Sequence, residues 1–318
     1  MQLDDASITY FKRWIALFPC AVSSKVEQNT AYVKCRCATH DWFESRRGEL
    51  RDMRDTLEVM KSGGVTSQEA LEVKPILEAV MSAQWLARGL LCSREHYKAK
   101  DLLLLCRDLI EALVGFGYQG SAFWRLLCYS SLGHAHLAFR KYPEAGDLLK
   151  QGLEAAAQHD GSDGLHERLF TGLCYAHLSS VHLEAEDFDE AVRCADLGLE
   201  IFERDLWSLL DERQAQADVP LDDVIDEDKE LLTAILATAY LNRGTCDVRR
   251  GNFDSGLSWY SSAKQCLHKN GNLGHDNDND EILKKLQEFE EHARHLQHYT
   301  SKPGLTESEA GAAEVASA

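Results

Sequence analysis

The chain has 318 residues, of which 44% are apolar and 27% are charged, and its formal net charge is −18. This composition is typical of a folded protein and excludes long disordered or collagen-like sequence. The acidic excess, without a local basic patch, argues against a nucleic-acid or anionic-membrane partner. No apolar run approaches the roughly 20 residues that span a bilayer, and the start MQLDDASITYFKRW does not resemble a secretory signal peptide.

Apolar residues recur at helical spacing along most of the chain, and few stretches alternate as strands do. The pattern predicts helices at residues 4–18, 26–60 (as two helices), 67–93, 95–115, 121–140, 143–158, 164–186, 188–209, 229–250, 253–269 and 279–299. Pro75 should kink or split its helix, because an interior proline removes a backbone hydrogen bond. Pro143 fits a first helical position. The fold class is therefore predicted to be all-α.

Three segments share one pattern of small and aromatic residues. An aromatic residue lies four positions before a small anchor and another lies nine after it, and small residues lie twelve and nineteen after it. The anchors are Gly133, Ser179 and Gly244. A small anchor lets one helix approach the next closely, and the later small residues lie where the two helices touch. Each segment is predicted to be a helix hairpin that must stack on its neighbours.

These segments, YSSLGHAHLAFRKYPEAGDLLKQGL, YAHLSSVHLEAEDFDEAVRCADLGL and YLNRGTCDVRRGNFDSGLSWYSSA, resemble the tetratricopeptide repeat family, over about residues 67–269. A fourth, weaker copy fits at Trp85 and Gly89, but its Tyr97 comes eight residues after Gly89, and Asp101 replaces the small residue. The anchors are 44, 46 and 65 residues apart, against about 34 in the family. The resemblance implies a right-handed α-solenoid of helix hairpins with an N-terminal helical cap and a C-terminal capping helix.

The repeats set the expected domain organisation. Residues 1–62 are predicted to form an N-terminal helical cap or degenerate hairpins, and residues 67–299 a superhelix of the tetratricopeptide type. The superhelix contains an acidic insertion at 207–230 and ends in the capping helix 279–299, and residues 300–318 are predicted to be a disordered tail. The insertion is interpreted either as a solvated loop that leads into the next helix or as a docking loop for a basic partner.

The resemblance also implies a function, which is protein binding. In this family the first helix of each hairpin lines a concave groove that holds a peptide or helix. The matching positions that offer hydrogen-bond donors or charge are Arg94, Ser130, His134, His177, Ser180, Asn242, Thr245 and Arg249. We therefore expect a non-catalytic scaffold or adaptor, located in the cytoplasm, cytoskeleton or cilium. Its partner would be a protein or peptide, and it could be a subunit of a cytoskeletal, ciliary or chaperone complex.

Two alternatives stay open. The first is a co-chaperone of heat-shock proteins, although the lysines with which such family members clamp an acidic C-terminus are missing here. The second is an enzyme or regulatory subunit with an unrecognised site. No P-loop, G-x-S-x-G or Rossmann motif is present, so no catalytic residue and no cofactor is expected. No metal site is expected either, since Cys35, Cys37 and His40 lack structural-zinc spacing, and the ten cysteines are predicted to be reduced.

Overall fold

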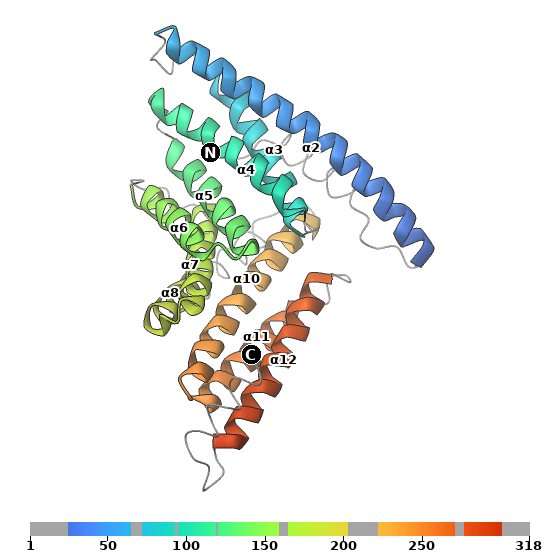
Figure 1. The fold of residues 1–318 in the computed structure, drawn as a ribbon, viewed down its shortest axis with the longest axis vertical. Coiled ribbons are helices and arrows are strands. Elements are labelled where there is room, and N and C mark those ends of the chain that lie inside the picture. The colour runs from blue at the N-terminus through green and yellow to red at the C-terminus, as the bar shows by residue number, and fades with distance from the viewer. Residues whose placement is uncertain are drawn as a thin grey trace. The chain divides into compact units, whose positions relative to one another are not determined.

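The computed structural model describes residues 25–64, 72–92, 95–118, 120–158, 165–202, 222–270 and 277–300. Their regular structure is helical, without a strand, which confirms the all-α prediction (Figure 1). The helices are α2 (Lys25–Ser62), α3 (Val73–Cys92), α4 (His96–Gly115), α5 (Ser121–Ala138), α6 (Tyr142–Ala157), α7 (Leu165–Glu184), α8 (Phe188–Glu200), α10 (Asp222–Arg249), α11 (Phe253–Asn270) and α12 (Asn277–Thr300). None of these helices is long and apolar enough to cross a membrane.

Several helix bounds differ from the predicted ones. The first is α2, a single helix where two were expected. Pro75 lies in the first turn of α3 and does not split it, because a backbone N–H has no helical partner there in any case. Pro143 lies in the first turn of α6, as predicted. Helix α8 extends to Glu200, and the predicted end of this helix at 209 lies outside the described residues. Helix α10 begins at Asp222, inside the acidic insertion.

Three predicted features lie outside the described residues. They are the helix over 4–18, residues 207–221 of the acidic insertion, and the tail from 301 onward.

The chain divides into two compact units, and the boundary falls inside α7, between His177 and Leu178. The first unit contains α2 to α6 and the beginning of α7. The second contains the end of α7, then α8, α11, α12 and α10 from Ile225 onward. Each unit is described by itself below.

In the first unit, α2 packs an apolar stripe against α4. Phe43, Leu50 and Leu57 recur every seven residues and are at most 4% exposed, so they lie on one side of the helix. Their core continues through α3, α4 and α5, whose consecutive pairs are in contact, and α5 in turn contacts α6. The helices from α3 to α6 therefore pack in chain order, whereas α2 packs mainly on α4.

Three hairpins, α5–α6, α7–α8 and α10–α11, reverse the chain with the same turn. The residue seven positions after each anchor has a positive φ: 55° at Arg140, 59° at Glu186 and 81° at Gly251. In each turn the next residue donates its backbone N–H to a carbonyl five positions earlier; the bonds are Lys141 to His136 (3.0 Å), Asp187 to His182 (2.9 Å) and Asn252 to Asp247 (2.8 Å). This is the Schellman arrangement at a helix C-terminus. The repeated segments therefore share backbone geometry as well as residue types.

The anchors also lie where the pattern places them. A Cβ atom built on Gly133 would be 2.6 Å from the Leu149 side chain and 3.5 Å from the carbonyl oxygen of Ala145. In the α10–α11 hairpin the approach is closer, since a Cβ on Gly256 would lie 2.9 Å from the carbonyl oxygen of Gly244. This confirms, for these two hairpins, the predicted contact between the anchor and the residue twelve positions later.

The register of the fourth copy was wrong by two residues. Its turn has the bonds Glu95 N–H to Leu90 (2.8 Å) and Ala99 N–H to Glu95 (3.1 Å). These match the other turns only if Ala87, and not Gly89, is the anchor. Ala87 and Ala99, twelve positions later, are both fully buried. With this register the first three anchors are 46 and 46 residues apart.

We predict that Gly256→Ala destabilises the protein by about 1–3 kcal/mol, because the new methyl group overpacks a helix contact that includes backbone atoms. The control is Gly48→Ala in α2, where an added Cβ meets no atom within 4 Å. That change should stabilise by about 0.5–1 kcal/mol, since glycine is unfavourable inside a helix. Urea unfolding followed by circular dichroism gives both values. Equal effects of the two substitutions would contradict the close contact.

Candidate functional site

Two of the predicted site residues meet in the first unit. The His134 ring on α5 and the His177 ring on α7 have centroids 4.7 Å apart and are tilted by 33°. The Nε2 atom of His177 is buried and has no hydrogen-bond partner among the described residues. Burial lowers the pKa of His177 well below its ordinary value, and the nearby His134 lowers it further. The side chain of His134 is exposed, so of the two rings it is the one presented to solvent.

The structure corrects the expectation for three other predicted residues, which are buried at 8% exposure or less: Ser130, Asn242 and Thr245. Ser130 donates to the carbonyl of Leu127 at 3.0 Å, within its own helix. Asn242 donates to the hydroxyl of Ser180 at 2.8 Å, and Thr245 donates to a carbonyl one turn earlier. Their polar atoms are used inside the fold and are not presented to a partner.

Of the remaining predicted residues, Arg249 is exposed at the end of α10, and Arg94 lies outside the described residues. The structure therefore groups the predicted residues into two pairs, His134 with His177 and Ser180 with Asn242. The acidic insertion 207–230 cannot be compared with them, since the structure describes only its last residues, from Asp222, as part of α10.

Six described cysteines are not in disulfides: Cys106, Cys128, Cys174, Cys194, Cys246 and Cys266. Burial raises the pKa of Cys128 to about 12 and that of Cys246 to about 11. Thiols with a raised pKa stay protonated near neutral pH and are poor nucleophiles. These two cysteines are therefore packing residues of the helical core.

A groove lies along one face of α2, with the start of α3 as its second wall; we call it the α2–α3 groove. It has a volume of about 700 Å³ and is lined by Glu44, Ser45, Gly48, Glu49, Asp52, Met53, Thr56, Leu57, Met60, Glu72 and Ile76. The lining residues of α2 recur every four positions and belong to one helix face. From Glu44 to Met60 this face extends over about 24 Å, or more than four helical turns.

The floor of the α2–α3 groove is apolar. Leu57 and Ile76 are buried, and Met53 and Met60 are partly buried against the core. Two other apolar side chains of α2 outside the groove are exposed, Trp42 at 39% and Val59 at 72%. This helix therefore leaves more apolar surface uncovered than one core contact requires.

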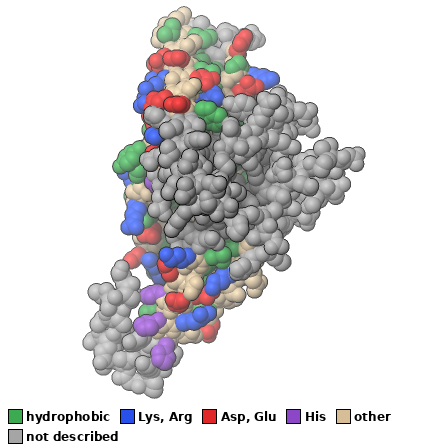
Figure 2. All heavy atoms as spheres, turned by 90° about the vertical axis from the view of Figure 1, so that its right-hand side faces the viewer, with side chains coloured by type: hydrophobic (Ala, Val, Ile, Leu, Met, Phe, Trp, Pro, Cys, Tyr) green, Lys and Arg blue, Asp and Glu red, His purple; other side chains and the backbone are tan. Residues whose placement is uncertain are grey.

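The rim of the α2–α3 groove is acidic. It carries four carboxylates and no lysine or arginine among the lining residues; the carboxylates are those of Glu44, Glu49, Asp52 and Glu72. Glu49 and Glu44 pair with Arg46 and Arg47, which lie outside the lining. Asp52 and Glu72 are exposed and form no ion pair with a described residue. On the face in Figure 2, by contrast, the described acidic and basic side chains are interspersed.

This groove was not predicted, because residues 1–62 match no repeat and were interpreted as an N-terminal cap or degenerate hairpins. A signal was present. Met53 and Met60 are seven residues apart, as Leu50 and Leu57 are, and they form a second apolar stripe beside the core stripe. A helix with two adjacent apolar stripes needs more than one packing partner to cover them.

No family model matches the chain, and no curated protein is similar to it. Among solved structures, it is similar to a crystal structure of BtubC (BKLC) from P. vanneervenii, with a TM-score of 0.35 and 17% sequence identity. The similarity covers 74% of this chain and 94% of that chain. A similarity this low supports no conclusion about fold or function.

We predict that His177 makes stability sensitive to mild acid. Its folded pKa is lowered, whereas the unfolded chain has an ordinary value of about 6.5. Below that pH the unfolded state binds a proton that the folded state does not, so stability is lost as the pH falls, by up to about 1.4 kcal/mol per pH unit. The variant His177→Gln should reduce the loss between pH 7.5 and 5.5 in urea unfolding.

The control is His298→Gln, at an exposed position of α12. If both variants keep the acid sensitivity of the parent protein, the folded structure does not hold His177 neutral.

Proposed function

We propose that this chain is a non-catalytic protein-binding scaffold or adaptor of the tetratricopeptide type, and that it binds a basic amphipathic helix of a partner protein in the α2–α3 groove. Two observations support the scaffold. Three hairpins share one turn geometry, and the corrected register places the first three anchors 46 residues apart, with 65 residues between the last two. Hairpins that pack on their neighbours along the chain are typical of repeat proteins that present long binding surfaces.

The observation that carries the choice of ligand is the α2–α3 groove itself. Its length of more than four turns of α2 suits a helix, since helices bind grooves through anchors spaced along one face. Its floor offers Met53 and Met60, flexible side chains that adapt to different apolar partners. Its rim offers only carboxylates, of which Asp52 and Glu72 have no basic partner among the described residues. Lysines and arginines flanking an apolar stripe would complement this surface.

An acidic peptide, which a co-chaperone would bind, is disfavoured in this groove by like charge. The concave groove expected from the repeat family is also less favoured as the binding site, because Ser130, Asn242 and Thr245 are buried. We propose a cytoplasmic location, for which cysteines outside disulfides are suited, since that compartment keeps thiols reduced.

The test uses the full-length chain and a labelled 20-residue helical peptide. Its leucines follow one another at steps of three and four residues in alternation, so that they form one stripe, and the other positions are lysines. We expect binding by fluorescence anisotropy that weakens as salt is added, because exposed charges are screened. The double variant Asp52→Lys with Glu72→Lys should weaken binding at least fivefold. Both positions are exposed, so the variant should remain folded.

The matched control is Glu58→Lys with Glu154→Lys, which reverses two exposed charges that do not line the groove. A scrambled peptide of the same composition, without the apolar stripe, controls for charge alone. The proposed site is wrong if both double variants weaken binding equally, or if the scrambled peptide binds as well as the helical one.

A further inference from the structure

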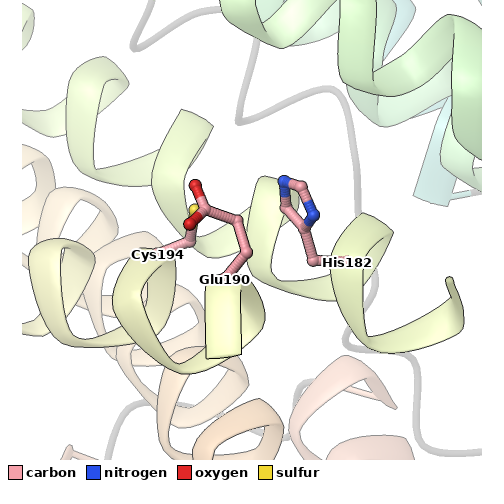
Figure 3. Close-up of side chains that lie close together, drawn as sticks. All are labelled: His182, Glu190 and Cys194. Carbon is pink, nitrogen blue, oxygen red and sulfur yellow. The ribbon is translucent and has the colours of Figure 1, made fainter. Parts of the chain in front are cut away.

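Three side chains of metal-ligand type meet where α7 ends and α8 begins. His182 lies in the last turn of α7, and Glu190 and Cys194 lie one turn apart on α8. One ligand atom from each side chain lies within 4.8 Å of the other two. In Figure 3 the three side chains extend toward the same side of these neighbouring helices. Imidazole nitrogen, carboxylate oxygen and thiolate sulfur are the three ligand types of protein zinc sites.

A second carboxylate, that of Asp187, lies beside His182. The Asp187 carboxylate has one oxygen 3.5 Å from Nδ1 of His182. Its other oxygen accepts the backbone N–H of Glu190 at 3.4 Å, which caps α8. The cap fixes the position of Asp187, so its second oxygen stays directed toward His182.

The convergence of these side chains is a property of the hairpin. His182, Glu190 and Cys194 lie three, eleven and fifteen positions after the anchor Ser179. In the α10–α11 hairpin the same positions hold Asp247, Ser255 and Trp259. There the Asp247 carboxylate accepts hydrogen bonds from Ser255 at 2.7 Å and from Trp259 at 3.1 Å. The shared turn therefore brings these three positions within bonding distance in two different hairpins.

We propose that His182, Glu190 and Cys194 bind a zinc ion, with Asp187 as the fourth ligand. A tetrahedral ion with bonds of about 2.0–2.3 Å holds its ligand atoms about 3.5 Å apart. The ligand atoms of His182, Glu190 and Cys194 are at most 4.8 Å apart and reach that separation by rotation of side chains on a fixed backbone. Sulfur and nitrogen ligands select zinc over calcium or magnesium, which require oxygen ligands. On binding, the Cys194 thiol loses its proton to solvent.

One contact of the metal-free protein competes with the ion. The Arg193 guanidinium pairs with the Glu190 carboxylate, with Nε at 2.8 Å from one oxygen. The Arg193 side chain is 59% exposed, and exposed ion pairs contribute little stability. Zinc would displace Arg193 into solvent and join the end of α7 to the first turns of α8.

The test is a titration of the full-length, chelator-treated protein with Co²⁺, which substitutes for zinc and is visible in absorption spectra. We expect one equivalent to give tetrahedral visible bands and a near-ultraviolet thiolate-to-cobalt band, both removed by one equivalent of Zn²⁺. His182→Gln should weaken binding at least tenfold, and Cys194→Ser should abolish the thiolate band. Arg193→Gln should tighten binding severalfold, because it removes the ion pair between Arg193 and Glu190 that competes with the metal.

The matched controls are His292→Gln on α12 and Cys266→Ser on α11, which should bind like the parent protein. Cys194 is buried, so circular dichroism must confirm that Cys194→Ser folds; if it does not, the half-buried His182 decides. The proposal is overturned if no thiolate band forms, or if His182→Gln binds Co²⁺ as tightly as His292→Gln. It is also overturned if the band survives Cys194→Ser in the folded protein.

Discussion

The hairpins of this protein depend on one chain reversal, in which a single residue adopts the left-handed backbone conformation. In α10–α11 that residue is Gly251, but in the other two turns it is Arg140 and Glu186. For a residue with a Cβ this conformation costs roughly 1–2 kcal/mol. The same turn satisfies carbonyls at the helix end. It also lets small residues of the two helices meet, as Gly133 and Ala145 do. These gains offset the strain.

Because the turn is shared, the same positions converge in α7–α8 and in α10–α11, and only their chemistry differs. In α10–α11 the buried carboxylate of Asp247 is fully bonded, since Arg243 donates to it at 2.6 Å in addition to the α11 donors. In α5–α6 the corresponding residue is His136, whose pKa is lowered by burial. In α7–α8 it is His182, beside a carboxylate and a thiol. The same location of a hairpin can thus hold a salt bridge, a histidine with a lowered pKa or, as proposed for α7–α8, metal ligands.

The hairpins could be predicted from the sequence because close helix contacts require small residues at fixed spacing. The weakest copy was placed wrongly because its anchor is Ala87, and a buried alanine in a helix carries little signal beside a nearby glycine. The site was harder to predict than the fold. Asn242 was expected to face a ligand, but it bonds Ser180, which is 62 residues away in the sequence. Such pairs depend on how hairpins pack, which spacing within one hairpin does not determine.

The α2–α3 groove lies on α2 because this helix has no partner hairpin to cover its whole apolar surface in the proposed scaffold. In the proposed scaffold, α2 is outside the repeated hairpins and packs through one stripe, that of Phe43, Leu50 and Leu57. A helix that ends a repeat array needs a polar outer face to remain soluble. Next to its core stripe, however, α2 carries Met53 and Met60, which the core covers only in part. The acidic rim keeps this second stripe soluble in the unbound protein, because it places charge beside the apolar floor. When a partner helix covers the groove, these carboxylates are removed from water, which costs much free energy unless the helix carries basic residues to pair with them. The rim therefore selects which partner the apolar floor can bind.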